Sequence, residues 1–189
     1  MEDDWKAAWQ PLVDAVGQDF SGGDLMEGAD EISAATIRRY LEPLEFDCAL
    51  HYDVDVARAH GYDDIVAPAT SLQTYSLPPM WRPGQTIFTS AERNAQPDTA
   101  TLAGFKSSLE PPTTGYFATD YEVEYLLPMI VGDRLRRRGA KLVSCLPRET
   151  KVGRGAFLTW EVEFINQRDD VIARAKTTWL RYNPPENRE

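Results

Sequence analysis

Cysteine and histidine are scarce in this chain, with two of each in 189 residues. Cys48 and Cys145 lie far apart and match neither a zinc-site nor a CxxC spacing. The sequence therefore predicts free thiols in a reducing compartment and no metal site. No glycine-rich phosphate-binding loop is present either, so no redox or nucleotide cofactor is implied.

Long apolar runs and positive charge are also in short supply. No apolar run approaches the roughly 20 residues that span a bilayer. The start, MEDDWKAAWQ, is acidic where a secretory signal would have a positive region and an apolar run. The net charge of −10 argues against a general nucleic-acid binder or a binder of anionic membranes. We therefore expect a cytoplasmic protein.

The composition can build a real core, because 42% of the residues are hydrophobic and five are Trp. The length suits one sizeable domain and is short for two. We expect a helical extension over residues 1–30 and a main domain over residues 31–183. Within the main domain, residues 80–114 read as an insertion or flap, and residues 184–189 as a polar tail.

Helical periodicity dominates the first part of the chain. An apolar face over Asp3–Val16 predicts a helix that Pro11 should kink or divide. Ser33 is typical of an N-cap, and SAATIRRYLEPL after it of a helix. A further segment, SLQTYSLPPMW, is compatible with a helix that ends by Pro78.

From Tyr116 onward the pattern becomes that of half-buried strands. The four expected strands are FATDYEVEYLLP, RLRRRGAKLVSCL, GAFLTWEVEFIN and VIARAKTTWLRY. The segment Met80–Thr114 has weak periodicity, and there we expect short strands or a substrate-covering flap. Helices followed by antiparallel strands indicate an α+β fold with helix packed on one face of the sheet.

Both histidines lie in one stretch, FDCALHYDVDVARAHGYDDIVAPAT. Histidine beside carboxylates on irregular backbone is typical of acid–base chemistry. His51 and Asp47 are the candidates for such chemistry, although the stretch could also be only a polar loop and a capped helix. Asp53 reads as the N-cap of DVARAHGY, and His60 as a structural residue at the C-terminal end of that helix.

Several phrases resemble one family. They are TIRRYLEPLEFDCALHYDVDVARAHGY, IVAPAT, the turn "P..VGD" within YEVEYLLPMIVGD, and the closing "N..D..IA.A" within INQRDDVIARAKTTW. From about Ile32 to Tyr182 the chain resembles the MaoC-like hydratases and dehydratases, most closely their N-terminal dehydratase-type domain. The resemblance implies a hot-dog fold, in which a long antiparallel sheet wraps a central helix, here with an extra N-terminal helix.

The family carries a catalytic loop of the form GDxNPxH, whose Asp and His activate water. His51 falls on the family histidine, whereas Phe46 stands where the aspartate should be. Asp47 would take that role if the loop were one residue shorter. The resemblance thus implies His51 as the central acid–base group and Asp47 as its partner.

A thioester carbonyl gains negative charge in the transition state and needs oriented donors, which amides at a helix N-terminus can supply. The candidate source of these donors is the helix that we expect to begin near Ala69–Ser71, after Pro68. The substrate-binding candidates are Pro68, Ala69, Thr70 and Ser71, with Thr70 or Ser71 as the cap.

The resemblance implies reversible hydration of a 2-enoyl-CoA to the (R)-3-hydroxyacyl-CoA, with no cofactor beyond the CoA thioester substrate. It also implies a homodimer, or a heterodimer with another MaoC-like chain. A non-catalytic, substrate-binding subunit of a heteromeric hydratase is the first alternative, which Phe46 favours and His51 opposes. A hot-dog acyl-CoA thioesterase is the second, with only Gln73 and Ser76 as polar candidates on the central helix.

Overall fold

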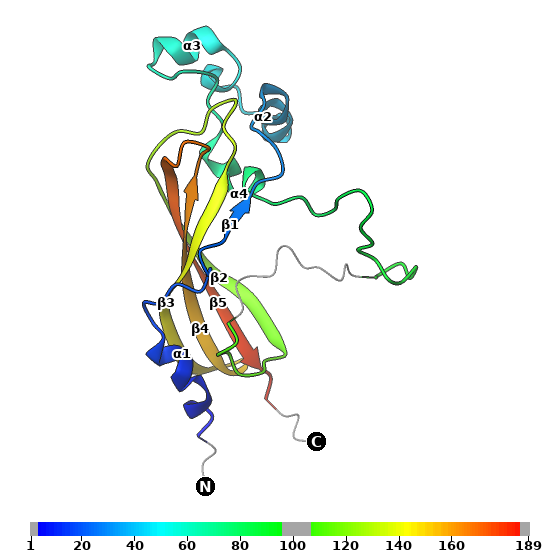
Figure 1. Ribbon diagram of the computed structural model, residues 1–189, viewed down its shortest axis with the longest axis vertical. Coiled ribbons are helices and arrows are strands. Elements are labelled where there is room, and N and C mark those ends of the chain that lie inside the picture. Colours follow the sequence, from blue (N-terminus) through cyan, green and yellow to red (C-terminus); the bar gives the residue numbers. More distant parts are fainter. Residues whose placement is uncertain (1–3, 96–106, 186–189) are drawn as a thin grey trace. The chain divides into compact units, whose positions relative to one another are not determined.

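The structure is a computed structural model, and it describes residues 4–95 and 107–185. These residues divide into two compact units (Figure 1). The sheet unit consists of the described residues in 1–25, 105–128 and 136–189, and the helical unit of those in 26–104 and 129–135. Within the described ranges no helix is long and apolar enough to cross a membrane.

Four long strands form the sheet unit. They are β2 (Gly115–Tyr125), β3 (Arg136–Thr150), β4 (Gly153–Ile165) and β5 (Val171–Asn183). Neighbouring strands are antiparallel, and their order is β3-β4-β5-β2. The four strands predicted from the alternating pattern are thus confirmed. A short strand, β1 (Leu25–Glu27), spans the division between the two units.

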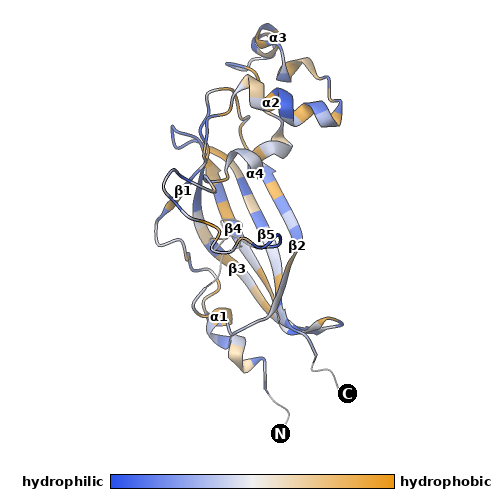
Figure 2. Ribbon diagram, turned by 90° about the vertical axis from the view of Figure 1, so that its right-hand side faces the viewer, coloured by the Kyte–Doolittle hydropathy of each residue, from blue (hydrophilic) through white to orange (hydrophobic). Residues whose placement is uncertain are grey.

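Apolar residues alternate with polar ones along these strands (Figure 2). In β4, Leu158, Trp160 and Phe164 are buried, whereas Thr159 and Glu161 between them are less so. This is the period of two that places successive side chains on opposite faces of a sheet.

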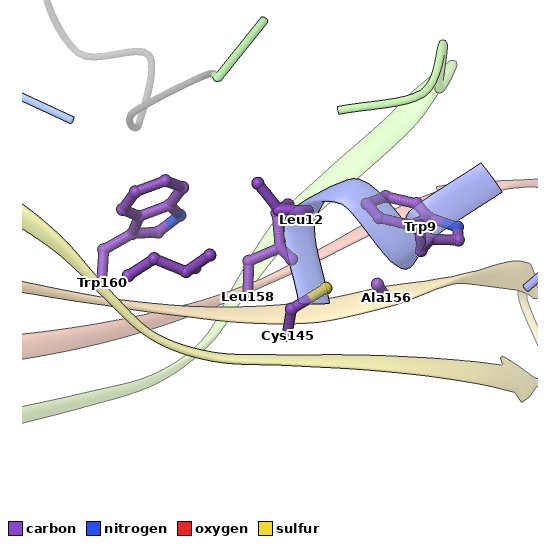
Figure 3. Packing of buried hydrophobic residues seen from close by; sticks show 7 residues of the cluster. Trp9, Leu12, Cys145, Ala156, Leu158 and Trp160 are labelled. Carbon is purple, nitrogen blue, oxygen red and sulfur yellow. The ribbon is translucent and has the colours of Figure 1, made fainter. Parts of the chain in front are cut away.

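One end of the buried face is covered by the N-terminal segment. A 3-10 helix, η1 (Ala7–Trp9), leads directly into α1 (Gln10–Asp14), and Pro11 lies in the first turn of α1. The division of the predicted helix at this proline is therefore confirmed. The core cluster consists of Trp9, Leu12, Leu142, Cys145, Ala156, Leu158 and Trp160 (Figure 3).

Short helices make up the helical unit. They are α2 (Ala34–Leu41), η2 (Glu42–Leu44), η3 (Ala49–His51), α3 (Val54–Ala59), η4 (Ala69–Ser71) and α4 (Leu72–Tyr75). Ser33 caps α2 as predicted, because its hydroxyl accepts from Thr36 N and the Thr36 hydroxyl accepts in return from Ser33 N, both at 3.2 Å. The helix predicted to run up to Pro78 ends earlier, at Tyr75.

The long segment that follows α4 is irregular wherever it is described. Residues 80–95 and 107–114 contain neither helix nor strand, so the short strands expected there are absent from these ranges. Residues 96–106 lie outside the described residues, as do residues 186–189 of the expected tail. A substrate-covering role for this segment stays a prediction.

The C-terminal end of this segment is fastened to β5. Asn183 accepts a hydrogen bond from Thr114 N at 2.9 Å and donates one to Pro112 O at 3.0 Å. The Glu110 carboxylate lies 3.5 Å from Arg181 Nε, and the two side chains are only 1% and 9% exposed. A buried ion pair therefore joins residue 110 to the sheet.

Candidate active site

His51 ends the 3-10 helix η3, and its ring is oriented by a backbone carbonyl. Nδ1 lies 2.6 Å from Val66 O. A carbonyl oxygen only accepts hydrogen bonds, so Nδ1 carries the proton of this bond. In the neutral imidazole, Nε2 then has a free lone pair and can act as a base.

Val66 itself is positioned by the turn that contains the "P..VGD" phrase. It forms an isolated antiparallel bridge with Ile130. On either side of it, Ala67 N donates to Met129 O at 2.8 Å and Val131 N donates to Ile65 O at 3.0 Å. Two phrases that are far apart in the sequence, IVAPAT and "P..VGD", are therefore neighbours, and together they hold the carbonyl that orients His51.

The turn of the "P..VGD" phrase has its own internal support. Gly132 has a φ of 91°, a conformation that glycine adopts without strain. Asp133 is buried, and its carboxylate accepts from Ile130 N at 3.1 Å. Asp133 is thus a structural residue, which keeps Ile130 in register with Val66.

Phe46 lies beside His51, and the two ring centroids are 5.6 Å apart at an interplanar angle of 44°. The side chain is 49% exposed. Tyr52 Oη donates to Phe46 O at 2.7 Å and thereby fixes the backbone at this point. The position that the family resemblance assigns to a carboxylate therefore carries an aromatic ring in contact with the imidazole.

Asp47 is exposed, and no hydrogen bond or ion pair within the described residues joins it to His51. The two candidate acid–base residues are four positions apart in the sequence, and no interaction between their side chains is found among the described residues. Asp47 as the partner of His51 stays a prediction.

Asp53 and His60 belong to the ends of α3. Asp53 is its N-cap, and the carboxylate accepts from Asp55 N at 2.9 Å and Val56 N at 3.2 Å, which confirms the predicted cap. His60 is the C-cap residue, and its Nδ1 donates to Val56 O at 2.8 Å. The second histidine is thus satisfied within its own helix.

The four predicted substrate-binding residues form the start of η4. Pro68 is the N-cap residue of η4, and no side chain caps this helix. Of the two expected cap residues, Thr70 or Ser71, it is Ser71 that occupies an N-cap position, at the start of α4. Its hydroxyl, however, donates backward to Pro68 O at 2.5 Å. The backbone amides of Ala69 and Thr70 have no hydrogen-bond acceptor among the described residues, so these two amides remain available to a ligand oxygen.

The thioesterase alternative finds no added support on α4. The helix contains no carboxylate, and the Ser76 hydroxyl at its end is buried and donates to Gln73 O at 3.0 Å. In the described part of the chain no group of His, Cys, Asp and Glu side chains could hold a metal ion.

The two cysteines are free. Cys145 belongs to the core cluster, and burial raises the pKa of its thiol to about 11. A thiol with such a pKa is almost wholly protonated at neutral pH and is a poor nucleophile. Cys145 is therefore a core residue.

The residue that sequence reasoning missed is Val66. It contributes a main-chain atom, and its side chain carries no chemical signal. The sequence offered one clue: the two family segments IVAPAT and "P..VGD" both occur in this chain, and in the structure they pair with each other through Val66 and Ile130.

Comparison with known proteins places the chain in a family. A family model described as "FAS1-like, dehydratase domain region" matches residues 15–175. A curated relative from Thermomonospora curvata, "Probable enoyl-CoA hydratase alpha subunit", is 26% identical over 164 residues, which cover 86% of this chain and 48% of that protein. The chain thus spans about half the length of this relative.

Solved structures show the same fold. A chain of the ChsH1–ChsH2 complex from Mycobacterium tuberculosis matches with a TM-score of 0.63 at 18% identity, covering 97% of this chain and 93% of that one. A MaoC-like dehydratase from Rhodospirillum rubrum matches with a TM-score of 0.53 at 18% identity, covering 86% and 93%. The chain therefore belongs to the FAS1-like dehydratase domain region family and has the hot-dog fold of the MaoC-like dehydratases.

Proposed function

We propose that the chain takes part in the reversible hydration of a 2-enoyl-CoA, giving the (R)-3-hydroxyacyl-CoA, with His51 as the central acid–base group. The observation that carries the proposal is the 2.6 Å hydrogen bond from His51 Nδ1 to Val66 O. It leaves Nε2 able to accept a proton, which is what activation of a water molecule requires. Family membership and the name of the Thermomonospora relative support the same reaction class.

In hydration, the hydroxyl of water forms a bond to the β-carbon while a proton is added at the α-carbon. His51 Nε2 would take the proton from the attacking water. Asp47 is the proposed second proton-transfer group, and it lies four residues before His51 in the same loop. The amides of Ala69 and Thr70 are the proposed donors to the thioester oxygen, which gains negative charge during the addition.

A second candidate function is a non-catalytic, substrate-binding subunit of a heteromeric hydratase. Phe46 favours it, because its ring occupies the neighbourhood of His51 where the family resemblance calls for a carboxylate. The words "alpha subunit" in the name of the relative point in the same direction. A homodimer, or a heterodimer with another MaoC-like chain, is the assembly that we propose for either function.

The test is enoyl-CoA hydration by the purified chain, followed through loss of the conjugated thioester absorbance on short, long and branched substrates. We expect His51→Ala to lose about 10²–10⁴-fold in rate, which is the usual contribution of a general acid–base group. His60→Ala is the matched control, because the hydrogen bond that its ring makes among the described residues goes to its own helix, and it should keep wild-type activity. Asp47→Asn tests the proposed partner.

The two candidate functions predict different results. If the wild type turns over and His51→Ala does not, the chain is a self-sufficient hydratase. If the wild type is folded and dimeric but inert on every substrate, the non-catalytic subunit is the correct reading. Equal activity of the wild type and His51→Ala would refute the proposed role of His51.

A further inference from the structure

The face of the sheet that lies opposite the core cluster carries its charges in stripes. In β4, Thr159 and Glu161 alternate with the buried Trp160, and the residues paired with them on the neighbouring strands lie on the same face. We call the part of this face that is level with residues 157–163 of β4 the outer face. Its charged side chains are Arg138 and Lys141 of β3, Glu161 and Glu163 of β4, Arg174 and Lys176 of β5, and Asp120, Glu122 and Glu124 of β2. Each strand therefore carries charge of one sign, and the sign alternates from strand to strand.

An apolar row crosses the outer face at one end of these stripes. The row consists of Leu146, Phe157, Leu180 and Phe117, which are paired in this order across β3, β4, β5 and β2. Leu146 is 60% exposed and Phe117 is 43% exposed. The Phe117 ring lies against Tyr182, with centroids 5.8 Å apart, and still leaves much of its surface open. Large apolar side chains grouped in this way are typical of an interaction surface.

Ion pairs within the sheet account for part of the charge pattern. Glu163 lies 2.7 Å from Arg138 and 3.1 Å from Arg174, and Glu161 lies 3.9 Å from Lys176. These side chains are 28–46% exposed, so the pairs contribute little to stability and their charges stay accessible from outside. Pairing within the sheet gives no reason for the exposed apolar row on the same face.

The charge balance of the outer face indicates what kind of partner fits it. The face holds four positive and five negative side chains, so its net charge is close to zero, although that of the chain is −10. Such a face does not favour nucleic acid or an anionic membrane, which bind to surfaces of uniform positive charge. Two copies of an acidic chain repel each other, and this repulsion is weakest where nearly neutral surfaces meet. The balance therefore favours a second copy of this chain.

The order of the strands makes the outer face complementary to itself. A two-fold axis parallel to the strands, over the gap between β4 and β5, lays β4 on β5 of the second copy and β3 on β2. Negative strands then face positive strands throughout. Leu146 stands opposite Phe117 of the second copy, and Phe157 stands opposite Leu180. Sheets that pack face to face usually keep their strands within about 30° of each other, which this axis allows.

A two-fold axis at right angles to the strands gives the opposite result. It lays each strand on the same strand of the second copy, so that like charges meet. It also reverses the strand direction and sets the apolar row against charged side chains. The pattern thus selects one symmetric arrangement.

We propose that the outer face is a self-association surface, on which a second copy of this chain packs sheet against sheet about the axis parallel to the strands. The face is four strands wide and seven residues long, or about 19 Å by 24 Å, which is the size of a weak interface. The contact is therefore dissociated in dilute solution. It adds to the dimer proposed above, so that two such dimers form a tetramer, and it does not depend on the proposed reaction.

The test is sedimentation equilibrium of the purified full chain at neutral pH, from about 1 to 200 µM. We expect the mass of the smallest species to double reversibly, with a dissociation constant on the order of 10 µM. A mass that stays constant over this range would overturn the proposal.

Two charge reversals, Glu161→Lys and Lys176→Glu, test the arrangement itself. The axis places these two residues opposite each other, so either change sets like charges against each other twice in one interface. We expect each variant alone to associate about tenfold more weakly or worse. An equimolar mixture should associate about as well as the wild type, because Lys at 161 of one variant then faces Glu at 176 of the other. The matched control, Glu31→Lys, makes the same charge change at an exposed position of the helical unit and should associate normally.

Circular dichroism checks that both variants are folded. If either is not, Leu146→Glu takes its place, because it sets a carboxylate against Phe117 of the second copy from a position that is 60% exposed. Undiminished association of the folded variants, a mixture that associates no better than its components, or an equal loss in Glu31→Lys would each overturn the proposal.

Discussion

In the sheet unit large side chains hold the structure together, whereas around His51 hydrogen bonds between short backbone segments do so. The core cluster joins Trp9 of η1 and Leu12 of α1 to the sheet (Figure 3). Its members on the sheet are Leu142 and Cys145 of β3 and Ala156, Leu158 and Trp160 of β4. The ring of His51, by contrast, depends on one carbonyl of Val66. The comparison teaches that the stability of the sheet unit depends on the volume of its buried side chains. The orientation of the His51 ring depends instead on the backbone geometry of residues 66 and 130.

The largest effect should come from emptying the sheet core. Trp160→Ala removes a side chain that is 2% exposed, and we expect it to lower the free energy of unfolding by about 4 kcal/mol. Leu146→Ala is the control, because Leu146 is 60% exposed, and it should cost no more than about 0.5 kcal/mol. Urea denaturation followed by circular dichroism measures both, and similar values for the two variants would contradict the comparison.

The next effect should come from the buried ion pair between Glu110 and Arg181. Glu110→Leu leaves the guanidinium buried without its carboxylate, and we expect a loss of about 3 kcal/mol. The double variant with Arg181→Leu should lose less than Glu110→Leu alone, because no unpaired charge then remains. A double-mutant cycle in urea measures the difference. A double variant that loses as much as the two single variants combined would show that the pair has no coupling.

In the helical unit a single side chain should matter less. Asp53→Ala removes the N-cap of α3, and we expect a loss of about 1 kcal/mol. Asp63→Ala, at an exposed position just after that helix, is the comparison variant and should be close to neutral. Thermal unfolding measures both. If Asp53→Ala lowered the free energy of unfolding as much as Trp160→Ala does, the proposed difference between the two units would be wrong.

The smallest effect should depend on pH. Hydrogen bonds from Arg138 and Arg174 hold the pKa of Glu163 below its usual value. A lowered folded-state pKa adds stability above the unfolded value of about 4.3, and this stability is lost as the pH falls through the folded value. Glu163 lies on a partly exposed face, so Glu163→Gln should cost about 0.5–1 kcal/mol at pH 7. Unfolding free energies of both proteins at pH 7 and below pH 4 measure this, and a difference that grows toward acid would contradict the sign.

Much of the fold was predictable because side-chain patterns encode it. The alternation in GAFLTWEVEFIN indicated a strand, Ser33 and Asp53 were recognisable caps, and Pro11 divided the first helix where it had to. Each of these signals is local, since it lies within the segment whose structure it predicts.

The site was less predictable because its determinants are not local. Sequence reasoning proposed His51 as the acid–base candidate, but the hydrogen-bond partner of its ring is a main-chain atom fifteen residues away, which no residue type reveals. It also treated Phe46 as a missing carboxylate, whereas the structure adds that this ring contacts the imidazole. The early end of α4 at Tyr75 was missed because the helix periodicity continues beyond the point where Ser76 caps the chain.

The bond between His51 and Val66 has a consequence for how the protein can vary. Every amino acid supplies a carbonyl, so exchanging Val66 for another β-branched residue leaves the acceptor in place. Related proteins that keep this bond must preserve the pairing of residue 66 with residue 130. They must therefore also preserve the length of the chain on either side of these two residues. Insertions and deletions near these two residues, more than substitutions, are the genetic changes that would alter which nitrogen of His51 holds the proton.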